Sequence, residues 1–298
     1  GALTTGGNNV AIGSGALLVA TTAADNTAVG TLALTANSSG TDNTAVGYAS
    51  LDANTTGADN TAIGDNALGA NTTASNNTAV GSYAGLAITK GKNNIALGAS
   101  ALRSEVGGDE SVAIGKDALY QQSASSDNAT MGNVGIGASA GYYNVTGISN
   151  TLIGYQAGYG ASGQSHRYNT AVGRKAMNLI TTGIYNVVIG YVAGESITTA
   201  NYNVVLGSQA GAGTTDVDNA VIIGYNAGRA NMTSDADGTI AIGYDAGKAI
   251  TTGRYNTAIG YQAFQSGSEL DKNTAIGYQA LYAMSGSAGT GQNTVVGY

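Results

Sequence analysis

Short apolar segments recur along the chain, and each of them ends at a glycine, as in "NTAIGYQA" at residues 273–280. This anchor glycine occurs 17 times; the spacing between neighbouring anchors is 17 in twelve of the sixteen intervals, and 19, 19, 20 and 22 in the others. The anchors are Gly13, Gly30, Gly47, Gly64, Gly81, Gly98, Gly115, Gly137, Gly154, Gly173, Gly190, Gly207, Gly224, Gly243, Gly260, Gly277 and Gly297. A fixed period of this length is typical of a stacked array in which each repeat forms one turn.

Positions within a repeat are numbered from the anchor glycine, which is position 0. Position −1 is Ile, Val or Leu in every copy, and position −3 is Thr, Val or Ile in every copy. Two bulky, mostly β-branched residues two positions apart are typical of a β-strand with both side chains on one face. A helix with glycine at a fixed point of each repeat would be poorly stabilised. The pattern therefore predicts an all-β parallel β-solenoid of about 17 turns, with one short strand in each turn.

The two faces of this strand are both apolar, and one of them must line the interior. We expect the side chains at −1 to be buried, namely Ile63, Ile114, Ile153, Ile189, Ile259 and Ile276. Position −2 then points outward, and it is occupied by Ala28, Ala45, Ala62, Leu152, Val188, Val205 and Ile222, among others. A soluble monomer rarely exposes a long apolar stripe. We therefore predict a homotrimer in which position −2 lies near the three-fold axis.

Glycine and asparagine have fixed places in the repeat. Glycine at all 17 anchors predicts a bend that a side chain would strain or obstruct. Asparagine occupies −4 in 14 copies, which predicts a ladder of stacked side-chain amides; the alternative is a row that binds a ligand. The four longer intervals, 116–136, 155–172, 225–242 and 278–296, should carry their extra residues in loops outside the strand ladder.

Tyrosine is concentrated at two positions of the repeat. Eight of the 18 tyrosines occupy +1 and four occupy −5. Tyrosines in register would form stacked columns, either packing within and between chains or presenting a surface that binds a partner. The candidate surface-binding stripe consists of Tyr155, Tyr191, Tyr225, Tyr244, Tyr261 and Tyr278.

Composition and isolated polar residues indicate no catalytic centre. A net charge of −7 with 10% charged residues offers no basic face for nucleic acid, and no apolar run reaches the ~20 residues of a membrane span. We expect His166 to be a solvated loop residue, and Glu105, Asp109 and Glu110 to form a solvated acidic face. Asp235 and Asp237 are spaced as in a calcium loop but lack its other ligands. We therefore expect no catalytic residue, no cofactor and no metal, and a protein that is not an enzyme.

The segments "NTAIGYQA" and "SVAIGKDAL", the latter at residues 111–119, resemble the repeats of YadA-like head domains of trimeric autotransporter adhesins. Similar runs occur in repeat arrays of bacteriophage tail-fibre-like proteins. The resemblance covers essentially the whole chain. It implies a left-handed parallel β-roll with three chains side by side, on an extracellular fibre at a cell or virion surface. Because the chain starts without methionine and stops within a repeat, we interpret residues 1–298 as one repeat array from a longer fibre.

The sequence thus predicts a structural or adhesive fibre segment that spaces or presents surface-binding sites. Its partners would be two further copies of itself and, through the tyrosine stripe, glycans or proteins on a host surface. Two alternatives remain. Threonine at −3 in nine copies is compatible with an ice-binding solenoid. A fibre-borne polysaccharide depolymerase would need two carboxylates about 5 to 9.5 Å apart in a groove.

Overall fold

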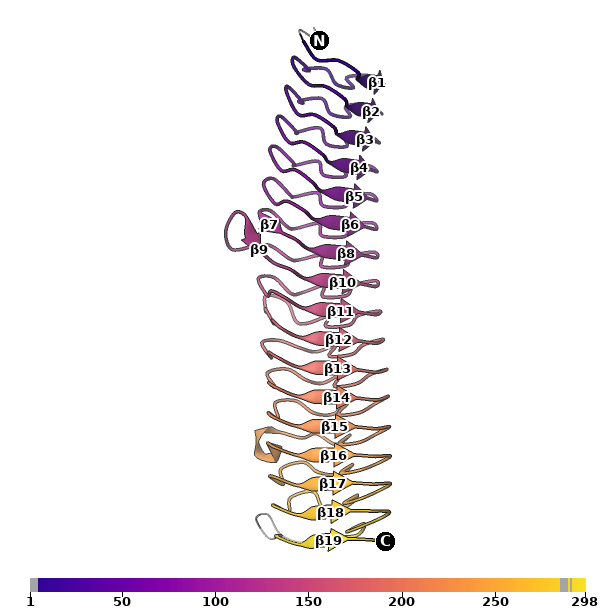
Figure 1. Cartoon of the computed structure of the whole chain (residues 1–298), viewed down its shortest axis with the longest axis vertical. Coiled ribbons are helices and arrows are strands. Elements are labelled where there is room, and N and C mark those ends of the chain that lie inside the picture. Colours follow the sequence, from indigo (N-terminus) through magenta and orange to yellow (C-terminus); the bar gives the residue numbers. More distant parts are fainter. Residues whose placement is uncertain (1–4, 285–288, 290) are drawn as a thin grey trace. The chain divides into compact units, whose positions relative to one another are not determined.

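Each repeat forms one turn that contains a three-residue strand, and successive strands stack in parallel (Figure 1). The structure is a computed structural model that describes residues 5–284, 289 and 291–298. The fold is an all-β parallel β-solenoid of about 17 turns, as predicted. The chain divides into two compact units, Gly1–Ser149 and Asn150–Tyr298.

From residue 5 onward, the first unit contains eight ladder strands and a small additional sheet. The ladder strands are β1 (Val10–Ile12), β2 (Thr27–Val29), β3 (Thr44–Val46), β4 (Thr61–Ile63), β5 (Thr78–Val80), β6 (Ile95–Leu97), β8 (Val112–Ile114) and β10 (Val134–Ile136). Each pairs in parallel with the next, and equivalent repeat positions face each other, for example Val10 and Thr27. Strands β7 (Gly108–Asp109) and β9 (Ala129–Thr130) pair outside the ladder.

Over its described residues, the second unit contains nine ladder strands with the same register. They are β11 (Thr151–Ile153), β12 (Thr170–Val172), β13 (Val187–Ile189), β14 (Val204–Leu206), β15 (Val221–Ile223), β16 (Ile240–Ile242), β17 (Thr257–Ile259), β18 (Thr274–Ile276) and β19 (Thr294–Val296). One short 3-10 helix, η1 (Ser234–Ala236), lies in the connection between β15 and β16.

The longer intervals do not disturb the register of the ladder. Across the longest interval, 116–136, Val112 still pairs with Val134, and the inserted segment supplies β9 of the small side sheet (Figure 1). In interval 155–172 the extra residues form a turn, and in interval 225–242 they include η1. In interval 278–296, residues 285–288 and 290 lie outside the described residues, so the prediction for this interval falls partly on residues that the structure does not describe. In the first three intervals the extra residues therefore lie in the connections, and the first of them includes a short strand.

The prediction of which strand face is buried was wrong. Ile63 and Ile189 are 39% and 41% exposed. The other four side chains expected inside, Ile114, Ile153, Ile259 and Ile276, are partly exposed. Position −2 is inside instead: Ala28, Ala45, Ala62, Leu152, Val188, Val205 and Ile222 are all 0% exposed. They consequently cannot form a trimer axis.

The interior is completed by residues that follow the anchor. Position +4 is a buried Leu, Met or Phe in many turns, as in Leu34, Leu68 and Phe264. Where +4 is glycine, a larger residue fills the same space. A Cβ on Gly158 would lie 2.5 Å from Leu152 Cδ2, and one on Gly194 would lie 3.2 Å from Val188 Cγ1. At Gly194 the Ile197 side chain at +7 is nearer still, with its Cδ1 2.7 Å from such a Cβ. Larger side chains at −2 or at +7 thus fill the space left by glycine at +4, which keeps the interior close-packed.

The anchor glycines and the asparagine ladder behave as predicted. Gly190 has φ of 145°, a conformation that L side chains rarely adopt, and a Cβ there would lie 2.3 Å from the carbonyl oxygen of Gly207 in the next turn. Asn203 donates both its backbone N–H and its side-chain amide to Asn186 Oδ1, each at 3.0 Å. Since these asparagines are buried and bonded to one another, the row is a structural ladder.

Candidate functional site

The outward side chains of the ladder strands form a continuous surface in each unit, termed here the strand face. It consists of positions −3 and −1, and none of these 34 positions (two in each of 17 repeats) carries a charged residue. In β13, Val187 is 38% and Ile189 is 41% exposed. Because the strands pair in register, the same chemical character repeats about every 4.8 Å along the stack.

Tyrosines at +1 border this face in the second unit. Tyr225, Tyr244, Tyr261, Tyr278 and Tyr298 form one stacked column with ring centroids 5.0 to 5.4 Å apart. Their side chains are exposed, as are those of Tyr155 and Tyr191. The ring faces contact one another, so the column presents edges and hydroxyl groups outward. A binding partner would therefore meet a row of phenol hydroxyls more readily than open ring faces.

A second column begins two residues before the strands. The rings of Tyr168, Tyr185 and Tyr202, all at −5, stack with centroids 4.8 and 5.3 Å apart. In the turn of β13, Tyr185 and Tyr191 are 47% and 49% exposed and stand on either side of Val187 and Ile189 in sequence. The strand face of this turn is thus bordered by an aromatic residue at each end.

In the turn of Gly173, position +1 is occupied by an arginine, Arg174, where the turns before and after it have tyrosine. The Arg174 guanidinium lies 5.7 Å from the ring centroid of Tyr155 and 5.6 Å from that of Tyr191. Its Nη1 also donates to the Tyr191 hydroxyl at 3.4 Å. The stripe predicted from sequence is therefore continuous only from Tyr225 onward, and Tyr155 and Tyr191 belong to a cation–π arrangement.

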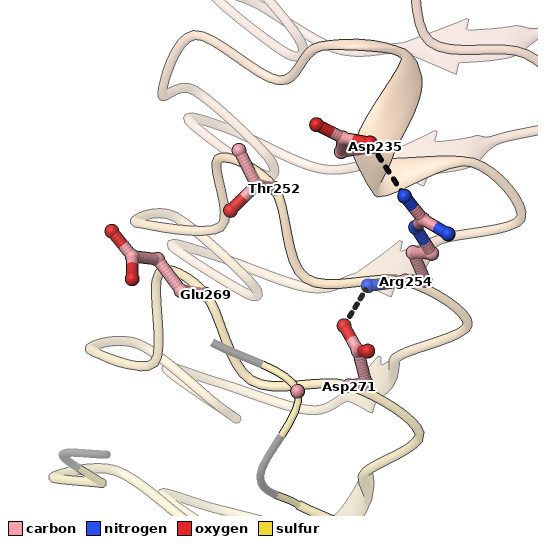
Figure 2. A pocket seen from close by; sticks show the side chains of 6 residues that line it. Asp235, Thr252, Arg254, Glu269 and Asp271 are labelled. Atoms are coloured by element: carbon pink, nitrogen blue, oxygen red, sulfur yellow. Dashed lines mark hydrogen bonds and ion pairs between the residues drawn. The ribbon is translucent and has the colours of Figure 1, made fainter. Parts of the chain in front are cut away.

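A pocket of about 390 Å³ lies between η1 and the following turns, lined by Asp235, Thr252, Arg254, Glu269, Asp271 and Gly289 (Figure 2). Arg254 Nη2 lies 2.6 Å from Asp235 Oδ1, and the Arg254 backbone N–H donates to Asp271 Oδ1 at 2.9 Å. The Glu269 carboxylate points away from the Arg254 guanidinium (Figure 2). Two of the three acids are thus engaged in contacts that hold neighbouring turns together.

Several acids belong to a second polar ladder, at position −6. Asp109 Oδ1 accepts the Lys92 N–H at 2.7 Å, and Asp237 Oδ1 accepts the Asp218 N–H at 2.7 Å. Asp271 occupies the same position and makes the bond to Arg254 described above. Desolvation by burial is the largest cause that raises the pKa of Asp237, and the neighbouring acids Asp218 and Asp216 add to it. Asp235 and Asp237 are therefore held apart in different contacts, one with a guanidinium and the other with a backbone N–H.

His166 is 1% exposed, so the prediction of a solvated histidine was wrong. Its Nδ1 lies 3.2 Å from Asn150 Oδ1, and its Nε2 lies 3.3 Å from the Gly158 carbonyl oxygen. Desolvation lowers its pKa from 6.5 to about 4, against the smaller opposing effect of the Gly158 contact. The insertion at 155–172 folds this side chain inward, where it joins the asparagine ladder.

Glu105 was also predicted to be solvated and is fully buried. Its Oε1 accepts the backbone N–H groups of Val106, Gly108 and Ala124 at 2.7 to 3.1 Å. Its Oε2 accepts the Gln122 side-chain amide at 2.9 Å. It occupies +7, where Asn37 and its equivalents accept a backbone N–H three residues later. Of the three predicted solvated acids, only Glu110 is exposed, and Asp109 is partly exposed.

The sequence analysis did not predict that polar residues outside the strands also stack in columns, one residue from each turn. Asp235, Thr252 and Glu269 share one column when repeats are aligned on the following anchor, and Asp237, Arg254 and Asp271 share another. Counting each residue's distance back from the next anchor glycine would have revealed both columns from the sequence alone.

Within the described ranges, no helix is long and apolar enough to span a membrane, and no three acidic or histidine side chains are grouped to hold a metal ion. No protein-family model matches the chain, and no curated protein sequence matches it.

Proposed function

We propose that this chain is a non-enzymatic segment of an extracellular fibre, in which three parallel copies associate through their strand faces. The observation that carries this proposal is the strand face itself. It is uncharged at every turn, and its isoleucines reach 39% and 41% exposure in the monomer. It carries an aliphatic side chain at −1 in every turn and a second one at −3 in eight of the 17 turns, and contiguous apolar patches beyond a few hundred Å² are rare on soluble monomers.

Three-fold symmetry suits the register of the ladder. In a closed parallel arrangement, each turn meets its equivalents at the same height. Val187 and Ile189 of one copy would therefore pack against Val187 and Ile189 of the other two. The resemblance to trimeric adhesin heads and tail-fibre repeats supports the same assembly, a left-handed β-roll and a location on a cell or virion surface. In this proposal the side chains at positions −3 and −1 line the trimer axis, in place of the position −2 side chains expected from the sequence.

The mass of the purified chain in solution tests this assembly. Light scattering after size exclusion should give about 88 kDa, three times the 29.3 kDa of one chain. Val187→Asp with Ile189→Asp should reduce the mass to that of one chain. Leu179→Asp is the matched control, because Leu179 is 49% exposed but lies outside the strand face. A wild-type mass equal to that of one chain at all concentrations would overturn the proposal.

One observation favours the ice-binding alternative as a second candidate. Thr27, Thr44, Thr61 and Thr78 lie in register on the strand face of the first unit. Each is followed two residues later by Val29, Val46, Ile63 and Val80 on the same face. A regular threonine and valine grid could order water in the way that ice recognition requires. Thermal hysteresis from a monomeric chain, lost in Thr61→Lys, would support this candidate over the fibre.

A further inference from the structure

A groove in the second unit brings together three of the seven Lys and Arg residues found in positions 150–298. It has a volume of about 350 Å³ and is lined by Arg174, Lys175, Tyr191, Glu195, Gln209 and Arg229, together with two smaller apolar residues. These residues come from four consecutive turns and occupy positions +1, +2 and +5. The groove therefore lies beyond the anchor bend, so packing of the strand faces would leave position +5 accessible.

Small side chains in one turn create this depression. At +5, Ala212 stands between Glu195 and Arg229, and at +1, Ser208 replaces the tyrosine found in the turns before and after. The longer side chains on either side consequently form the walls, and Ala212 lies between them. The depression is a consequence of which residues occupy this turn, since the backbone keeps the register of its neighbours.

The groove has an excess of positive charge. Three cations and one carboxylate line it. Lys175 Nζ lies 3.5 Å from Glu195 Oε1, whereas neither Arg174 nor Arg229 forms a salt bridge within the described part of the chain. The two arginines thus leave about two uncompensated charges on a chain whose net charge is −7. A local field opposite to that of the whole protein selects anionic groups at this place.

We propose that this groove binds an anionic oligosaccharide, with one carboxylate or sulfate group held by Arg174 and another held by Arg229. Guanidinium groups bind such planar or tetrahedral anions through paired, charge-assisted hydrogen bonds. The Tyr191 hydroxyl and the Gln209 amide supply neutral hydrogen-bonding groups suited to sugar hydroxyls. Arg174 and Arg229 belong to turns three apart, which is about 14 Å along the stack, so the groove suits an oligosaccharide. This inference deepens the proposed function and rests on it, because it names what an adhesive fibre would bind.

Arg174 is prepared for this role by its neighbours. Its guanidinium rests between the Tyr155 and Tyr191 rings, which restricts its conformations without neutralising its charge. Preorganisation of a long side chain lowers the entropy lost on binding. A nucleic acid could also supply anions, but the overall charge of −7 would oppose a long phosphate backbone.

Retention in affinity electrophoresis tests the proposal, with gels containing a polyuronate, a sulfated polysaccharide or neutral dextran. The wild-type chain should be retarded by at least one of the two anionic polymers and not by dextran. The polymer that retards it more strongly identifies carboxylate or sulfate as the preferred group. Arg229→Ala should weaken retention at least about tenfold, and Glu195→Gln should strengthen it. Arg254→Ala is the matched control, since it removes a positive charge from the same unit outside the groove.

The outcomes separate this site from fibre assembly. Absence of retardation by both anionic polymers, equal losses in Arg229→Ala and Arg254→Ala, or stronger retention on single-stranded nucleic acid would overturn the proposal. Light scattering on the same samples reports the number of chains. Retention by a monomer would overturn the fibre assembly while supporting the saccharide site, and a trimer without retention would do the reverse.

Discussion

Aspartate substitution at two adjacent residues of β13 should have different consequences, a loss of folding stability at one and a loss of self-association at the other. Val188 is 0% exposed and points into the solenoid, whereas Ile189 is 41% exposed on the strand face. Val188→Asp removes a buried valine side chain, worth about 1.5 to 3 kcal/mol. It also places a carboxylate in an apolar interior, which costs several kcal/mol more. The combined loss of about 5 kcal/mol or more exceeds the effect of most single substitutions.

Ile189→Asp leaves the interior unchanged. We expect it to fold with the secondary structure of the wild type and to lose self-association, because the new charge would lie in the interface between strand faces. Since association itself raises apparent stability, the Val188→Asp change is best measured in the Ile189→Asp background. There its effect on the free energy of unfolding is separate from any effect on assembly.

Hydrogen exchange by mass spectrometry is the suitable assay, because repeat proteins can unfold locally. Val188→Asp should remove protection from β12 to β14, and Ile189→Asp alone should leave it within a few tenths of a kcal/mol per protected amide. Val188→Ala, which makes only a cavity, should lie between the two. If Ile189→Asp abolishes protection while Val188→Asp retains it, the assignment of the faces is incorrect.

Three further outcomes are expected. Gly190→Ala should destabilise the second unit by about 3 kcal/mol or more in guanidinium denaturation, whereas Gly163→Ala, where a Cβ meets nothing within 4 Å, should cost only about 1 to 2 kcal/mol. Because the pKa of His166 is lowered to about 4 in the folded state, the unfolded chain binds more protons between pH 4 and 6.5. Stability should therefore fall by about 3 kcal/mol from pH 6.5 to pH 4, and this loss should be absent from the pH series of His166→Gln. Asn186→Ala leaves the buried N–H of Asn203 without its acceptor and should cost about 1 to 3 kcal/mol in the same denaturation assay, an effect whose absence would refute the structural role of the ladder.

Much of this fold could be derived from the sequence because the repeat superimposes equivalent residues. Once each repeat makes one turn, every residue lies against its own equivalent in the next turn, whatever the shape of the turn. Bonding between Asn186 and Asn203, stacking between Tyr261 and Tyr278, and the close approach of Gly190 to the next turn all follow from that single fact. Register and columns were therefore predictable without knowing where the interior lies.

The direction of the interior was decided only by the tertiary structure. A short strand with Val187 and Ile189 on one side and Val188 on the other is apolar on both, so its alternation identifies two faces without distinguishing inside from outside. The chain after the anchor turns back over the Val188 side, and there Ile197 fills the space beside Gly194. The burial of His166 has the same origin, because an insertion can fold inward or outward with an unchanged ladder. Packing between segments that are distant within the turn selects one of these arrangements. The pattern of residues along the strand carries no information about that packing.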